Sequence, residues 1–205
     1  MNNLIIFAGY PATGKTYIIN KIKNNYKNIY SLSIDDIEEY FYDNYGFYNL
    51  NEKRELYDLS FEIFYLKLRK YMKENKDIVI DYPFSYLQYG NLKELITKYG
   101  YNPITIRLTG DLKTIYKRRV ARDLDPNRNA GHLLNEYNSN MKIDEGIRKE
   151  NLISYEEFVS HCKFREYDQF KLGALLVEDV SDKYADIDKI TRFLNLEMRK
   201  NDDNR

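Results

Sequence analysis

The chain has 205 residues, of which 43% are hydrophobic, and this is enough to build one domain around a buried core. Its 32 Lys and Arg are balanced by 32 Asp and Glu, which excludes a strongly basic nucleic-acid-binding coat and leaves room only for a local basic patch. One cysteine excludes an internal disulfide, and with two histidines it does not make a zinc site. No apolar run has the length of a membrane span and the first residues lack the basic start of a signal peptide, so we expect a cytoplasmic protein without membrane contacts.

Short apolar runs alternate with helical patterns along the whole chain, which is typical of an α/β fold. We expect strands at 4–8, 29–34, 78–81, 104–108 and 174–177. Apolar residues three and four apart predict helices after the first strand, from about 36, and at 52–73, 92–99, 112–124, 154–162 and 187–198. The expected organisation is a single domain over residues 1–200, followed by a frayed tail at 201–205.

The first predicted strand runs into a phosphate-binding motif. Residues 9–16 read Gly-Tyr-Pro-Ala-Thr-Gly-Lys-Thr, which matches Gly, four residues, Gly, Lys and Ser or Thr. The glycines let the backbone wrap closely around phosphate oxygens, Lys15 is placed to reach the β- and γ-phosphates, and the Thr16 hydroxyl is placed to bind Mg²⁺. A simple glycine turn is the alternative, but a strand before the motif and a helix after it favour ATP and Mg²⁺. The residues expected to bind the nucleotide are Gly9, Pro11, Ala12, Thr13, Gly14, Lys15, Thr16 and Tyr17.

Two acidic residues, Asp35 and Asp36, follow the second predicted strand. The carboxyl ends of parallel strands face the ligand crevice in open α/β sheets. A carboxylate there accepts the proton of a hydroxyl that attacks the γ-phosphate. The alternative is a structural role, with Asp35 as the N-cap and Asp36 near the positive end of the helix. We expect at least one of the two to be catalytic and prefer Asp35.

Asp81 ends the third predicted strand, at the position from which a carboxylate helps to hold Mg²⁺ beside a phosphate loop. The alternative is that Asp81 only opens the turn before Pro83. We therefore expect Thr16 and Asp81 to be the metal-binding residues.

A basic segment follows the fourth strand, with six Lys and Arg against two Asp between residues 113 and 128. Arg118 and Arg122 are four residues apart and share one face of a predicted helix, whereas Arg119 is expected to point elsewhere. We expect residues 113–132, called the lid below, to bring Arg118 and Arg122 to the phosphates and to exclude water. The alternative is a solvated basic helix face.

Other candidate residues stay open at this level. His132 either contacts substrate or caps a helix, while His161 is expected to be structural. The aromatic stretch 40–48 either stacks on an acceptor or packs against the following long helix.

The order of these features resembles the small P-loop kinases, in the branch that contains polynucleotide 5′-kinase, zeta toxins and chloramphenicol phosphotransferase. The features are the phosphate loop, Asp35-Asp36, Asp81, Arg118-x-x-x-Arg122 and Arg128-x-x-Gly131-His132, over residues 3–180. The resemblance implies a three-layer α/β/α P-loop NTPase fold, with five parallel strands in the order 2-3-1-4-5 and a helical lid. It also implies that Asp35 is the general base, that Arg122 with Arg118 contacts the transferring phosphate, and that adenine lies near 177–181.

One position departs from that resemblance. Polynucleotide kinases carry an arginine three residues after the catalytic aspartate to hold the acceptor's phosphate, and here that position is Glu38. An acidic residue repels a phosphate, so nucleic acid is disfavoured as a partner. The sequence thus favours a kinase that moves the γ-phosphate of ATP to a hydroxyl of a small molecule. The alternatives are a polynucleotide 5′-hydroxyl kinase and a nucleotide-dependent switch.

Overall fold

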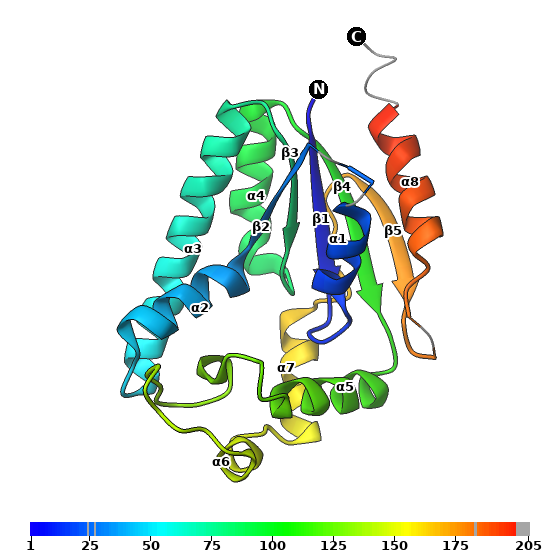
Figure 1. The fold of residues 1–205 in the computed structure, drawn as a ribbon. Coiled ribbons are helices and arrows are strands. Elements are labelled where there is room, and N and C mark those ends of the chain that lie inside the picture. Colours follow the sequence, from blue (N-terminus) through cyan, green and yellow to red (C-terminus); the bar gives the residue numbers. More distant parts are fainter. Residues whose placement is uncertain (24, 27, 183, 200–205) are drawn as a thin grey trace.

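The computed structural model describes residues 1–23, 25, 26, 28–182 and 184–199, and in them a parallel sheet lies between two layers of helices (Figure 1). Neighbouring strands follow the order β2-β3-β1-β4-β5, and each neighbouring pair is parallel. The expected α/β class and strand order 2-3-1-4-5 are therefore confirmed. The expected tail at 201–205 lies outside the described residues. The strands are β1 (Asn3–Gly9), β2 (Ile29–Ser33), β3 (Asp77–Asp81), β4 (Asn102–Thr109) and β5 (Ala174–Asp179).

The helices agree with the sequence pattern except at two places. A capping box of Ser85 and Gln88 starts one helix at Tyr86, well before the apolar stripe that begins at Leu92. A short helix at 145–150 was not predicted, because six residues are too few to display a periodic pattern. The helices are α1 (Lys15–Lys23), α2 (Ile34–Tyr45), α3 (Leu50–Lys73), α4 (Tyr86–Tyr99), α5 (Leu112–Leu124), α6 (Glu145–Glu150), α7 (Tyr155–Arg165) and α8 (Ile187–Arg199), with a 3₁₀ turn η1 (Ala130–His132).

Alternation along the central strands divides the core between the two faces of the sheet. Leu4 and Ile6 of β1 pack toward α2, α3 and α4, around Phe64 of α3. Ile5 and Phe7 point the other way and pack against α1 and α8. Because side chains alternate in a strand, a run that is apolar at every position is what burial on both faces requires. This double burial holds the strand that leads into the phosphate loop.

A third, smaller core lies beyond the carboxyl ends of the strands. It joins Ile115 of α5 to Phe158 and Cys162 of α7 and to Val180 after β5. Figure 1 shows α5 and α7 at that end of the sheet. They therefore stand opposite the loops that leave β1, β2 and β3. Within the described residues, no helix combines the length and the apolarity that crossing a bilayer needs.

Candidate active site

The phosphate loop has the backbone conformation that its glycines predict. Gly9 has a φ of 105° and Gly14 a φ of 87°, in the region that favours glycine. A Cβ on Gly9 would lie 1.9 Å from the carbonyl oxygen of Leu108, so only glycine fits against β4. In the described part of the chain, none of the N–H groups of residues 12–16 donates to a backbone carbonyl. The loop therefore presents unengaged donors at the N-terminus of α1, which is an arrangement suited to phosphate.

Lys15 is folded back onto this loop. Its Nζ donates to the carbonyl oxygens of Gly9, at 3.3 Å, and Tyr10, at 2.8 Å. Burial lowers the pKa of Lys15 to about 8, and the nearby charges of Asp81 and Asp35 oppose that shift. An anion in the loop would favour the charged form of Lys15, so this lysine is placed to bind phosphate.

Thr16 and Asp81 meet at the carboxyl end of β3. The Thr16 hydroxyl donates to Oδ2 of Asp81 at 2.7 Å, and both residues line the same cavity. Asp81 is 6% exposed, and burial raises its pKa above the ordinary value. A hydroxyl and a buried carboxylate beside a phosphate loop are hard oxygen ligands, so they fit Mg²⁺ in the company of phosphate oxygens.

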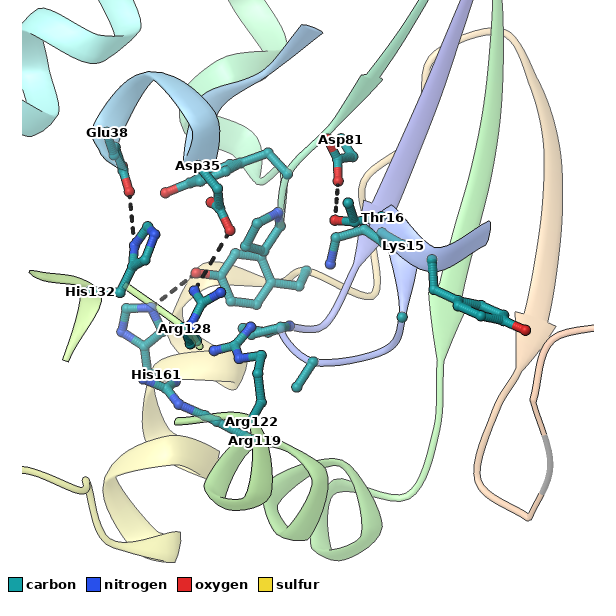
Figure 2. A pocket seen from close by; sticks show the side chains of 17 residues that line it. Lys15, Thr16, Asp35, Glu38, Asp81, Arg119, Arg122, Arg128, His132 and His161 are labelled. Atoms are coloured by element: carbon teal, nitrogen blue, oxygen red, sulfur yellow. Dashed lines mark hydrogen bonds and ion pairs between the residues drawn. The ribbon is translucent and has the colours of Figure 1, made fainter. Parts of the chain in front are cut away.

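These residues share one cavity of about 460 Å³ with side chains from five further segments. Figure 2 shows Lys15, Thr16 and Asp81 on one side, Glu38 and His132 on the other, and Asp35 between them. The cavity is lined by Pro11, Ala12, Gly14, Lys15, Thr16, Tyr17, Asp35, Glu38, Asp81, Tyr82, Pro83, Arg119, Arg122, Arg128, His132, His161 and Tyr167.

The two aspartates after β2 face different cavities. Asp35 lines the cavity with the phosphate loop, and its Oδ2 lies 3.7 Å from an η nitrogen of Arg128. Asp36 lines a separate cavity between α2 and α3. The N-cap of α2 is Ser33, so Asp35 does not have the capping role that was the structural alternative. Of the two, Asp35 is the carboxylate that shares a cavity with the phosphate loop.

The arginines of α5 are arranged differently from the expectation. Arg122 lines the cavity as predicted, but Arg118 does not. Arg118 instead donates to the carbonyl oxygens of Val180, at 2.6 Å, and Ser181, at 3.4 Å. Arg119, which we expected to point elsewhere, takes a place in the lining. The packing of α5 against the strand end at Val180 sets this rotation, and helical spacing alone does not reveal it.

One buried carboxylate organises three of the arginines. Asp123 is 5% exposed and accepts from Nε of Arg119, at 3.2 Å, and from two nitrogens of Arg122, at 3.1 and 2.9 Å. Nε of Arg128 lies 3.7 Å from the same carboxylate. Asp123 thus holds a cluster of guanidinium groups at the cavity without lining it. The sequence offered a signal only in its position between the arginines.

The cavity also contains residues that were not expected in it. His161 and Tyr167 line it, with His161 Nε2 and the Tyr167 hydroxyl 2.9 Å apart. Burial, then Arg165 and Arg119, lowers the pKa of His161. No residue of the aromatic stretch 40–48 lines this cavity, and Tyr42 and Phe47 of that stretch are buried in packing contacts. Tyr17, Tyr82 and Tyr167 supply the aromatic surface instead.

Neither the known family models nor the curated proteins contain a match to this sequence. Solved structures share its fold. A putative kinase from Chloroflexus aurantiacus J-10-fl superposes with a TM-score of 0.74 at 20% identity, over 96% of this chain and 98% of that one. A gluconokinase from Sinorhizobium meliloti 1021 gives 0.51 at 10% identity, over 98% and 94%.

A third structure comes from the PezAT toxin–antitoxin system of Streptococcus pneumoniae. It gives a TM-score of 0.50 at 14% identity, over 88% of this chain and 69% of that one. At these identities the likeness establishes a common fold with kinases, and the activity of this chain has to be argued from its own cavity.

Proposed function

We propose that this protein is a kinase that uses ATP and Mg²⁺ to phosphorylate a hydroxyl group of a small molecule. The observation that carries the proposal is the placement of Asp35 in one cavity with Lys15, Thr16, Asp81 and a group of arginines. A phosphate loop alone fits any nucleotide-binding protein, including a switch. A carboxylate facing the same space adds a proton acceptor, which a transfer to a hydroxyl requires.

In the proposed reaction the acceptor oxygen attacks the γ-phosphorus while the bond from that phosphorus to the β–γ bridging oxygen breaks. The hydroxyl proton passes to Asp35, and ADP leaves with the bridging oxygen. Lys15 and the loop amides hold the β- and γ-phosphates. Arg119 and Arg122 stabilise the charge on the transferring group, and Arg128 orients Asp35. Mg²⁺, held by Thr16 and Asp81, would neutralise charge on the phosphate oxygens.

The kinase structures that share this fold support the proposal, including the one named as a gluconokinase. A polynucleotide 5′-kinase is the weaker candidate, because Glu38 lines the cavity where the resemblance places an arginine for the acceptor's phosphate. Nothing in the cavity favours a switch over a transferase.

The first prediction distinguishes the residues needed for ATP binding from those needed for phosphotransfer. Lys15→Ala should abolish ATP binding, because it removes the only lysine among the described residues that line the cavity. Asp35→Asn should leave ATP binding intact and lower phosphotransfer by about 10²-fold or more, which is the usual effect of losing a general base. Isothermal titration with Mg·ATP, together with ADP release measured over a panel of hydroxyl compounds, separates the two effects.

Asp36→Asn is the matched control, since Asp36 adjoins Asp35 on α2 but faces a different cavity. It should retain both binding and transfer. Full phosphotransfer by the Asp35 variant would contradict its role as the base. Absence of any purine triphosphate binding by the intact protein would contradict the kinase itself.

A further inference from the structure

The wall of the cavity opposite the phosphate loop carries a second carboxylate, Glu38. It lies three residues after Asp35 on α2, so the two side chains share one face of the helix. Glu38 is 5% exposed, yet it is among the residues that line the cavity. Burial raises its pKa, His132 opposes that shift, and the charge of Asp35 adds to it. Because the charge of Asp35 acts on the pKa of Glu38 and both residues line one cavity, Glu38 lies near the proposed site of proton transfer.

Only one of the two Glu38 oxygens is engaged. Oε2 lies 3.3 Å from Nδ1 of His132, whereas Oε1 has no hydrogen-bond partner in the described part of the chain. A buried carboxylate oxygen without a donor is costly, so its retention needs an explanation. The terminal torsion of a glutamate is broad, so rotation about it can offer a carboxylate oxygen to a donor in the cavity that Glu38 lines.

The cations around Glu38 are shared with, or directed to, other groups. His132 bridges two carboxylates, with Nε2 at 2.9 Å from Glu39. Nζ of Lys53 donates to the carbonyl oxygens of His132 and Leu134. Arg128 faces Asp35 and Asp123. An anionic group beside Glu38 would therefore meet like charge. Each of these three cations already faces oxygen atoms of other residues, although Nε of Arg128 makes no hydrogen bond in the described part of the chain.

His161 and two tyrosines form an uncharged part of the lining, in contrast to His132, whose pKa is raised to about 9. Burial lowers the pKa of His161, so it is neutral at pH 7. Tyr82 and Tyr167 complete the lining with rings and hydroxyl groups. These three side chains accept hydroxyl or amine groups and carry no positive charge of their own.

We infer that Glu38 selects the acceptor, by taking a hydrogen bond from a second O–H or N–H group on an uncharged or positively charged alcohol. Polyols and amino alcohols satisfy this requirement, and alcohols with a phosphate or carboxylate beside the reacting hydroxyl do not. The inference rests on the proposed kinase function and adds the class of its substrate. A cavity of about 460 Å³ that also receives a triphosphate limits the acceptor to a small molecule.

The first test uses the wild-type protein and probes with matched carbon skeletons. Glycerol and glucose are the uncharged probes, and ethanolamine and glucosamine are the probes that carry an amine. Glycerate and gluconate carry a carboxylate. Glycerol 3-phosphate and glucose 6-phosphate carry a phosphate. ADP release is measured for each at saturating Mg·ATP. Uncharged or amine probes should exceed their anionic partners in kcat/KM by about tenfold or more, as expected for a hydrogen bond to a charged group. Comparing the uncharged probes with the amine probes also shows whether polyols or amino alcohols are the better acceptors.

Two results would overturn the inference: an anionic probe that is phosphorylated best, or no stimulation by any uncharged or amine probe in a protein that binds Mg·ATP. The proposed function fails differently, because then Mg·ATP does not bind and no probe is phosphorylated. The two failures are therefore distinguishable in the same experiment.

The second test compares Glu38→Gln with Glu39→Gln. Both remove a carboxylate from His132, but the Glu39 side chain is 37% exposed and lies outside the lining. Glu38→Gln should raise the acceptor KM by about ten- to hundredfold with an unchanged KM for ATP, and should reduce the disadvantage of anionic probes. Glu39→Gln should change neither.

Equal effects of the two variants on the acceptor KM would mean that Glu38 acts only by holding His132, and would contradict the inference. Thermal unfolding of both variants verifies that they fold. If Glu38→Gln does not fold, the comparison of probes on the wild-type protein decides alone.

Discussion

Asp123 is the residue on which the basic side of the cavity depends. It joins Arg119, Arg122 and Arg128 through one buried carboxylate, although it contributes no surface to the cavity. Charge-assisted hydrogen bonds of this kind fix the direction of each guanidinium group. The arginines are thus positioned before any nucleotide binds, which is the condition for electrostatic stabilisation of a transition state.

Asp123→Asn tests this arrangement. The variant leaves the arginines without their common anion, so kcat should fall by about tenfold or more while ATP binding changes less. Loss of the buried pairs should also lower the free energy of unfolding by about 3 kcal/mol. Asp125→Asn is the control, since Asp125 lies at the exposed end of α5 and accepts from Asn127. An unchanged kcat in Asp123→Asn would refute the positioning role.

A second residue-level prediction separates Arg118 from Arg119. Arg118 holds the carbonyl oxygens after β5, in the loop where the resemblance places adenine, so Arg118→Gln should raise KM for ATP and spare kcat. Arg119→Gln should lower kcat by about 10²-fold, because it removes a donor from the transferring phosphate. Steady-state kinetics with varied ATP distinguishes these results, and a reversed pattern would restore Arg118 to the catalytic group.

At the scale of elements, the segment after α5 is held against α2 by hydrogen bonds and close packing. Asp43 of α2 accepts from Asn129, at 2.8 Å, and from the Tyr137 hydroxyl, at 3.0 Å. Gly131 is packed so closely that a Cβ there would lie 2.5 Å from the ring of Tyr42. The part of the lid from Arg128 to His132 is therefore seated against the helix that carries Asp35 and Glu38.

Gly131→Ala should push this segment away from α2. Overlap with the Tyr42 ring predicts a loss of about 1–3 kcal/mol in stability, which chemical denaturation measures. The double variant with Tyr42→Leu should recover part of the loss, because the smaller side chain makes room. A Gly131→Ala variant as stable as the wild type would show that the contact is not needed.

Elements with strong periodicity were predictable, and their orientation was less so. The apolar runs that predict strands at 4–8 and 78–81 and the pattern that predicts a helix from 154 are local signals, and the structure confirms each of these elements. The choice between Arg118 and Arg119 depends on how α5 rotates against Val180, which is a long-range contact. Glu38 stood out in the sequence only as a departure from the polynucleotide kinase pattern, and its burial against His132 depends on a residue 94 positions away.

At the scale of the whole molecule, His132 links stability to pH. Burial lowers its pKa, but Glu38 and Glu39 raise it more, and the result is about 9 against an ordinary 6.5. The stabilisation is complete below pH 6.5 and is lost as the pH rises to about 9, for a total of about 3 kcal/mol. His132→Gln should therefore flatten the decline of stability between these values.

Denaturant unfolding of both proteins from pH 6 to 9.5 measures the difference. The comparison of the wild type with His132→Gln is needed because burial also lowers the pKa of Lys15 and Lys53 to about 8. Above that pH these two lysines make the free energy of unfolding rise with pH, which is opposite in sign to the effect of His132. His161→Gln should leave this window unchanged, since the pKa of His161 is lowered. Parallel curves for the wild type and His132→Gln would exclude the ion pairs as a source of stability.

Met1 and the end of α8 at Arg199 lie at the amino-terminal edge of the parallel strands, at the opposite end of the sheet from α5 and α7 (Figure 1). Immobilising the protein through either of these points leaves the end of the sheet that carries the cavity residues away from the support. A sensor surface prepared in this way would report nucleotide and acceptor binding without steric interference from the linkage.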